Sequence, residues 1–176
     1  MIEIEIDDSA IRAALQNLLA VTGNSDDVLN EIGEHLAEST LHRFETKTGP
    51  NGKRWADNSP VTIERKGRND PLIDHGSLSE QIHAQLLGDD TLAVGSSMEY
   101  AAVQQFGAKM GEFGRYSQIA RVRKYGLGTF QGSAGTQKGF PLPWGDIPAR
   151  PFLGVSEDDR DAILAIIQAH LNDAIG

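Results

Sequence analysis

The stretch Tyr100-Ala101-Ala102-Val103-Gln104-Gln105-Phe106-Gly107 is short, apolar on one side and closed by a glycine. A predicted strand over 91–95 precedes it. After it, a long segment rich in glycine and basic residues leads to Ile147-Pro148-Ala149-Arg150-Pro151-Phe152-Leu153-Gly154. We interpret the two motifs as fixed points of a packed body, and the residues between them, 107–147, as an extended loop or arm. This arrangement favours a role in assembly over a role in catalysis.

The bulk composition predicts one folded domain over residues 1–176. Apolar residues make up 39% of the chain and charged residues 23%, which is the balance of a globular protein. The chain has no cysteine, which excludes disulfides and thiolate metal sites. The acidic, alternating start lacks the pattern of a signal peptide, and no apolar run has the length of a membrane helix, so no membrane partner is expected.

The charges are distributed unevenly along the chain, whose formal net charge is −9. Residues 1–45 hold ten acidic and two basic residues. Residues 107–150, in contrast, hold two acidic and seven basic residues, a net of +5. An acidic body with one basic segment suits docking against copies of the same chain or against another charged partner.

Four helices are predicted from apolar residues that recur every three or four positions behind a capping residue. They run from Ser9 to about Val21, from Ser25 through Phe44, over 60–66, and from Ser156 through Ala174. The second is the longest element of the first half. The expected buried residues are Ile11, Leu15, Leu18 and Leu19, then Val28, Leu29, Ile32, Leu36, Thr40 and Phe44, and finally Ile163, Ile166, Ile167, Leu171 and Ala174.

Strands are predicted where apolar and polar residues alternate. The start of the chain alternates isoleucine with acidic residues over 2–7, and a similar alternation covers 81–87. Gly88-Asp89-Asp90 is typical of a hairpin connection, so 91–95 is expected to pair back on 81–87. Residues 107–147 contain nine glycines and no periodic pattern, which predicts a long loop that includes at most a local hairpin.

One helix face could be drawn as a metal site. The candidate ligands are Glu31, His35, Glu38 and His42. They share one side of the second helix, because residues three and four apart are neighbours. We favour an ordinary solvated face, since no ligand or general base is indicated on another element. Asp74-His75 and His83 are likewise interpreted as turn and strand residues, so no catalytic, cofactor-binding or metal-binding residue is assigned.

The segment 107–147 carries cations beside aromatic residues, as surfaces that contact phosphates and stack on bases do. The candidate partner or DNA contacts are Arg115, Arg121, Arg123, Lys124, Lys138 and Trp144. The acidic remainder of the chain would be repelled by a polyanion. A solvated loop, or a strip that meets an acidic patch on a neighbouring subunit, would explain the same residues. A nucleic-acid-contacting module acting through the basic loop 115–124 is therefore the second interpretation.

The large aromatic residues are candidates for the core or for an interface. Phe106 and Phe152 lie inside tight apolar motifs, and we predict that both are buried in the core. Trp55 fits either role. Trp144 belongs to the proline-rich run Phe140-Pro141-Leu142-Pro143-Trp144-Gly145, which cannot join a central strand and suits an arm that lies on another surface.

Four motifs together resemble the phage virion morphogenesis (tail completion) family of Mu-like phages and prophages. They are Gly52-Lys53-Arg54-Trp55, Leu72-Ile73-Asp74-His75-Gly76-Ser77-Leu78, and the two stretches 100–107 and 147–154. The likeness extends from the second helix to the last, and the two final motifs are the specific ones. The chain departs from the family in having His75 in place of the usual threonine and Gln105 in place of the usual histidine or glutamate.

The resemblance implies an α+β fold in which a long helix packs on an antiparallel sheet. It also implies a structural, non-enzymatic protein of tail completion or head–tail joining, with other tail and neck proteins as partners. Related neck proteins form rings, commonly of six subunits, and genome DNA passes through the neck. The expected location is the virion tail or neck, after assembly in the host cytoplasm.

The two specific motifs also carry expectations for single residues. The predicted structural residues are Tyr100, Phe106, Gly107, Arg150, Pro151 and Phe152. Pro148 and Pro151 hold the backbone extended, so that Phe152 and Leu153 can pack. Arg150 is expected to pair with a carboxylate or with backbone carbonyls, a structural role.

Overall fold

A computed structural model describes residues 9–23, 25–87, 91–109 and 146–175, together with the backbone of 115–116 and 140–141. The helices are α1 (Ser9–Thr22), α2 (Asp26–Thr46), α3 (Pro60–Lys66), α4 (Ala101–Phe106) and α6 (Glu157–Ile175). The strands are β1 (Ile82–Leu86), β2 (Leu92–Ser96), β3 (Arg115–Tyr116) and β4 (Phe140–Pro141). Helices and antiparallel strands combine in an α+β fold, as expected.

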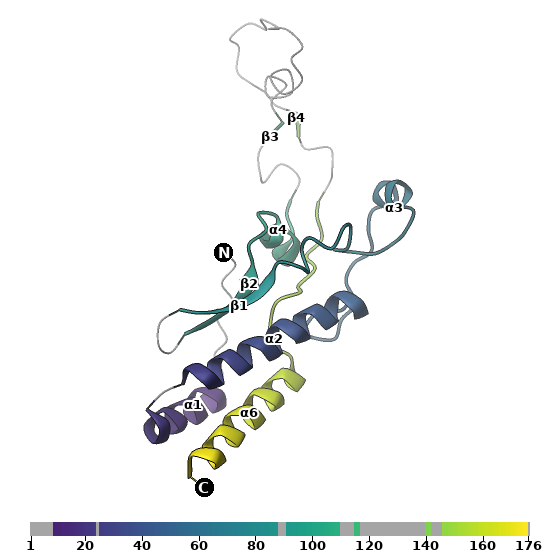
Figure 1. Ribbon diagram of the computed structural model, residues 1–176. Coiled ribbons are helices and arrows are strands. Elements are labelled where there is room, and N and C mark those ends of the chain that lie inside the picture. The colour runs from purple at the N-terminus through teal and green to yellow at the C-terminus, as the bar shows by residue number, and fades with distance from the viewer. Residues whose placement is uncertain are drawn as a thin grey trace, which may run out of the picture.

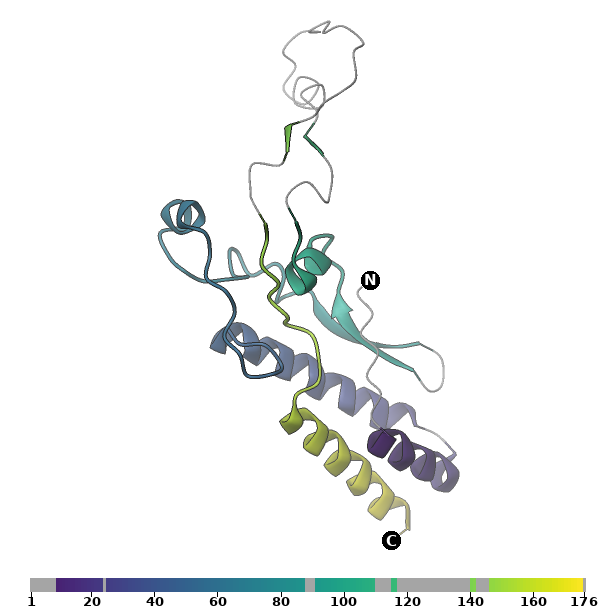
Figure 2. The same cartoon turned by 180° about the vertical axis from the view of Figure 1, so that it is seen from behind.

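The long helix α2 is the middle layer of the body (Figures 1 and 2). The hairpin β1–β2 packs on one side of α2, and α6 packs on another, with α1 beside α6. The hairpin is antiparallel, with Ile82 opposite Ser96 and Leu86 opposite Leu92. This arrangement confirms the prediction of a long helix against an antiparallel sheet. Within the described residues, no helix is long and apolar enough to cross a membrane.

Two hydrophobic clusters stabilise the body, one at each end of α2. The first consists of Phe44, Trp55, Leu78, Ala101, Phe152 and Leu153. The second joins α1, α2 and α6 through Leu18, Val28, Ile32, Ile163 and Ile167. Because α2 supplies residues to both clusters, the apolar stripe along it holds the layers together.

The hairpin approaches α2 closely at Gly33, in the middle of the helix. A Cβ atom at this position would lie 2.8 Å from Ala84 Cβ on β1 and 2.9 Å from Leu92 Cδ1 on β2. Both distances are below van der Waals contact, so any larger residue forces the helix and the hairpin apart. A glycine here therefore sets the distance between the two layers.

Several sequence predictions are confirmed in detail. Helix α3 spans 60–66, with Ser59 Oγ accepting from Thr62 N at 3.3 Å and Gly67 closing the helix at φ +68°. Ser156 caps α6, because its Oγ accepts from Asp159 N at 3.1 Å. The hairpin 82–96 has the expected pairing, whereas the expected strand over 2–7 and the turn over 88–90 lie outside the described residues.

Other predictions at the helices are corrected. Ser9, expected as a cap, is already part of α1. Leu19 and Ala174 were expected to be buried, but both are exposed. Leu18 faces α6 and fills the available apolar contact, so its neighbour Leu19 points to solvent, and Ala174 lies in the last turn of α6, beyond the packed part of the helix.

Candidate functional site

The two specific motifs meet at one junction, formed by α4 with Gly107 and by the extended residues 147–154 (Figure 1). Its centre is the buried side chain of Gln105. Gln105 Oε1 accepts from Phe152 N at 2.9 Å and from Leu153 N at 3.0 Å, and Gln105 Nε2 donates to Leu153 O at 2.9 Å. One amide thus satisfies three backbone groups that would otherwise be buried without partners.

The same junction holds together the two ends of the segment 107–147, for which the sequence predicts a loop or arm. Ala108 N donates to Ile147 O at 2.9 Å and Ile147 N donates to Ala108 O at 2.8 Å, an antiparallel bridge. Gly107 makes this possible, since its φ is +76° and a Cβ there would lie 2.7 Å from both Ala149 N and Ile147 O. Only glycine fits such a close backbone approach at this φ.

Further out, the backbones of β3 and β4 also pair in an antiparallel manner, with Tyr116 opposite Phe140. They lie beyond α4 and away from the helices (Figures 1 and 2). Of residues 107–147, the structure describes 107–109, these two short strands and 146–147, so the long loop expected for this segment stays a prediction. The other residues of this segment lie outside the described part of the chain.

Arg150 connects the junction to the loop that carries α3. Arg150 N donates to Gln104 O at 2.8 Å, and its guanidinium donates from Nε to Ala56 O at 2.8 Å and from a terminal nitrogen to Asp57 O at 2.9 Å. The expected pairing with backbone carbonyls is confirmed. Burial lowers the pKa of Arg150, opposed by the charge of Asp57, and the side chain stays a cation because an arginine pKa starts so high.

Arg43 and Asp159 form a buried ion pair behind the junction. The Arg43 guanidinium also donates to Phe152 O at 3.0 Å, to Gly154 O at 2.9 Å and to Ser39 Oγ at 3.1 Å. Asp159 in turn accepts from both the backbone N and the Oγ of Ser156 at 2.7 Å. The pair therefore joins α2, α6 and the end of the 147–154 segment through one satisfied polar network.

The ionisation of both partners follows from this network. Burial lowers the pKa of Arg43, and the adjacent carboxylate of Asp159 opposes that shift. Burial would raise the pKa of Asp159, but hydrogen bonds from Ser39 and Ser156 and the charge of Arg43 outweigh it and hold that pKa below its ordinary value. Both groups are thus charged at neutral pH.

The structure corrects the placement of one predicted core residue. Phe152 is fully buried, as expected, and its ring packs against Phe44 with centroids 5.6 Å apart. Phe106 is 62% exposed. Helix α4 buries Ala101 and Gln105, which lie one turn apart on the same face, so the next residue, Phe106, points outward. Tyr100 precedes the helix and is also exposed.

The remaining predicted residues divide into two groups. Gly107, Arg150 and Pro151 belong to the junction, where Pro151 O accepts from Trp55 Nε1 at 2.7 Å. Trp55 itself is a core residue. The predicted contact residues Arg121, Arg123, Lys124, Lys138 and Trp144 lie outside the described residues, and only the backbone of Arg115 is described.

Three of the four candidate metal ligands on α2 contact separate partners. His35 Nε2 lies 3.4 Å from Asp159 Oδ1, His42 Nδ1 lies 3.2 Å from Glu45 Oε2, and Glu31 Oε2 lies 2.7 Å from His170 Nε2. Among the described residues, no three histidine or acidic side chains are arranged to hold a metal ion.

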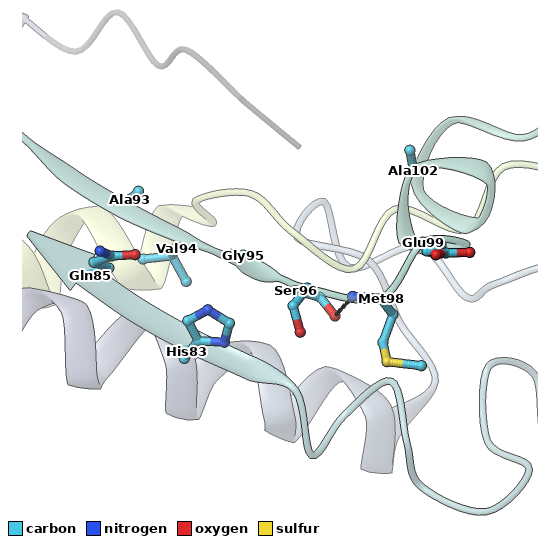
Figure 3. A pocket seen from close by; sticks show the side chains of 10 residues that line it. His83, Gln85, Ala93, Val94, Gly95, Ser96, Met98, Glu99 and Ala102 are labelled. Carbon is cyan, nitrogen blue, oxygen red and sulfur yellow. Dashed lines mark hydrogen bonds between the residues drawn. The ribbon is translucent and has the colours of Figure 1, made fainter. Parts of the chain in front are cut away.

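A hollow of about 420 Å³ lies on the face of the hairpin that is opposite α2 (Figure 3). His83 and Gln85 of β1 and Ala93 and Gly95 of β2 line it, and Met98 and Ala102 extend the lining toward α4. Its lining combines small and apolar side chains with one imidazole and the Glu99 carboxylate. Such a surface suits contact with another molecule more than an assembled set of catalytic groups.

Sequence reasoning missed two residues of the junction. Arg43 carried a usable signal, because it falls on the apolar stripe of α2 between Thr40 and Phe44, where a cation requires a buried partner. The signal at Gln105 was weaker, since a polar residue in a short apolar motif can point either into the core or to solvent. Aromatic residues are usually buried, so the sequence predicted that its neighbour Phe106 is buried instead.

A body that fixes both ends of a long, basic, glycine-rich segment is typical of an assembly protein. The chain belongs to the phage virion morphogenesis family, whose model matches residues 6–172.

Two relatives illustrate the likeness. Tail completion protein S of Escherichia phage P2 is 26% identical over 141 residues, which is 80% of each chain. Mu-like prophage FluMu G protein 2 of Haemophilus influenzae is 29% identical over 169 residues, covering 96% of this chain and 94% of the relative. No solved structure matches the chain significantly. These relatives give no support to the nucleic-acid-contacting alternative.

Proposed function

We propose that this protein is a structural, non-enzymatic component of the phage virion that completes the tail and joins it to the head. The family and the name of the phage P2 relative support this role. Its place is the head-proximal end of the tail in the virion, after assembly in the host cytoplasm.

The junction around Gln105 is the observation that carries the proposal. It brings Ala108 and Ile147 together as a bridged pair, so the arm leaves and re-enters the body at one point. A loop that is held rigidly at its base can present a basic surface to a partner while the body keeps its own fold. Such a role needs no set of catalytic groups.

The proposed partners are other tail and neck proteins and further copies of this chain. A ring requires two different patches on each subunit that meet head to tail. The basic arm and the acidic body supply patches of opposite charge. We propose that copies of this chain form a ring, and six subunits is the first stoichiometry to test. We also propose that residues of the arm face the channel of this ring and contact the genome DNA.

Deletion of the gene tests this function directly. Electron microscopy of particles made without the protein should reveal heads and tails that remain separate, and a plasmid copy of the gene should restore joined particles. If tails mature and join heads normally without the protein, the proposed function is wrong. Light scattering on the purified protein and on isolated tail ends would measure the subunit number.

A further inference from the structure

The loop around α3 protrudes from the body (Figures 1 and 2). We define residues 57–70 as the α3 lobe. No helix or strand of the described chain packs extensively on α3, and Val61 on its outer side is 74% exposed. A valine in that position gains nothing in stability within its own chain.

The lobe is nevertheless held firmly at its base. Asn58 N donates to Asn69 Oδ1 at 3.0 Å, which closes the lobe across its two ends. The Lys66 ammonium binds the carbonyls of Asp70 and Ile73, and Lys47 forms an ion pair with Asp70. Arg150 holds the carbonyls of Ala56 and Asp57, as described above. The lobe is therefore fixed at its base in one position relative to the arm junction.

The outer side of the lobe has a defined chemistry. Arg65 lies one turn after Val61 on the same side of α3. Arg65 is exposed and forms no ion pair within the described part of the chain. The outer side of the α3 lobe thus presents one apolar side chain, Val61, with a cation, Arg65, one helical turn away.

A complementary surface exists on α2. Glu34, Glu38, Leu41 and Glu45 are all exposed and follow each other at spacings of three and four residues, so they share one side of α2. Helical geometry places this side away from Gly33, which packs on the hairpin, and from Arg43, which pairs with Asp159 of α6. Leu41 is 41% exposed. The α2 stripe, meaning these four residues, therefore has an apolar centre with a carboxylate one turn away on either side, the counterpart of Val61 and Arg65.

We propose that the α3 lobe docks on the α2 stripe of a second copy of this chain, with Val61 against Leu41 and Arg65 against Glu38. This contact deepens the proposed function, because it defines one head-to-tail interface between subunits. Lobe and stripe are different surfaces, so each copy can bind one neighbour on either side.

Nucleic acid is a poor occupant for the lobe. Protein surfaces that bind nucleic acid are strongly positive and polar, whereas Val61 is apolar and Glu64 adds a carboxylate directly beside Arg65. An acidic, partly apolar protein surface satisfies both Val61 and Arg65 together.

Cysteine cross-linking tests the contact, because the chain has no cysteine of its own. Two variants with different affinity tags, Val61→Cys and Leu41→Cys, are produced together in cells that make the phage tails, and the tails are then oxidised. The mixed disulfide dimer should exceed that of a control pair, Val61→Cys with Ile175→Cys, at least about tenfold, since disulfides form only between close Cα atoms. Ile175 is a matched control because it is 73% exposed.

A charge exchange supplies an independent measurement. Arg65→Glu should reduce the mixed dimer about tenfold, because like charges then face each other, and adding Glu38→Arg to the partner should restore it. Equal cross-linking in the test and control pairs, or no effect of either charge change, would overturn the interface. Neither result affects the proposed function, which the gene deletion tests separately.

Discussion

Gln105 is a buried polar side chain whose amide binds the segment that lies against α4. It contributes three hydrogen bonds to the backbone of Phe152 and Leu153, all in a buried site. Loss of this amide would leave two N–H groups and one carbonyl without partners in the core. The side chain therefore determines whether the 147–154 segment can lie against α4.

Replacement of Gln105 by methionine keeps the size of the side chain and removes its hydrogen bonds. We expect the free energy of unfolding to fall by about 3 kcal/mol, because each buried group left unpaired costs about 1–3 kcal/mol. Chemical denaturation measures this free energy of unfolding. The control is Gln104→Met, which changes a half-buried neighbour whose backbone carbonyl, not its side chain, binds Arg150. Similar stability for both variants would contradict the role given to Gln105.

Arg150 is predicted to be structural through its two guanidinium hydrogen bonds. Arg150→Ala should lower the free energy of unfolding by about 2–4 kcal/mol, since a hydrogen bond from a charged group contributes about 1.5–3 kcal/mol. Arg150→Lys should recover part of this loss only, because an ammonium group lacks the planar fork that reaches both carbonyls. Thermal denaturation distinguishes the three proteins. Unchanged melting and assembly of Arg150→Ala would rule out this role.

Asp159 makes stability depend on pH in the acid range. Its pKa in the folded protein lies below the ordinary value of 3.8, so the unfolded chain binds this proton first as the pH falls. The stabilisation is therefore complete above pH 3.8 and is lost as the pH falls through the lower folded value. Asp159→Asn should flatten this part of the pH profile and cost about 3 kcal/mol at neutral pH by leaving Arg43 buried without its partner.

The exposed neighbour Asp158 provides the matched control for this experiment. Asp158→Asn should change the neutral-pH stability little, since the side chain lies in solvent in the first turn of α6. If the Asp159→Asn variant lost stability with falling pH as steeply as the original protein does, Asp159 would not be the cause. The pH dependence of the free energy of unfolding would then come from other carboxylates, such as Asp70 beside Lys47.

At the level of elements, Gly33 controls how α2 meets the hairpin. Gly33→Ala should lower the free energy of unfolding by about 1–2 kcal/mol, although alanine is the better helix former by about 1 kcal/mol. The reason is that overpacking against Ala84 and Leu92 costs about 1–3 kcal/mol. Adding Ala84→Gly should recover part of the loss, which a double-mutant cycle measures. A more stable Gly33→Ala variant would contradict the close packing.

Elements with strong local signals could be predicted from the sequence. The Ser59-Pro60 start and Gly67 stop defined α3, and strict alternation defined β1. Side-chain orientation in α4 could not be predicted, because six residues are too few for a periodic pattern to select a face. Which face of α4 is buried depends on contacts with residues 152 and 153, some fifty positions later in the chain. No local sequence pattern contains these contacts.

At the scale of the whole molecule, the sequence predicted the pairing of Arg150 with backbone carbonyls, but it did not predict the other contacts by which the two specific motifs meet. The sequence indicated that 100–107 and 147–154 are anchored. It did not indicate that one glutamine and one arginine connect them to each other and to the α3 lobe. Such long-range polar contacts depend on the tertiary arrangement, in which α4, the 147–154 segment and the loop after α2 meet.

The central claim is that body and arm have separate tasks, folding in one case and assembly in the other. The Ala108–Ile147 bridge allows a clean test, because a short glycine-rich turn can replace residues 110–145 next to two residues that already pair. We measure the melting temperature of this variant and its ability to restore joined particles to the deletion phage. We expect a melting temperature close to that of the full chain and no joined particles. Normal joining of heads and tails by the armless variant, or failure of its body to fold, would contradict the account.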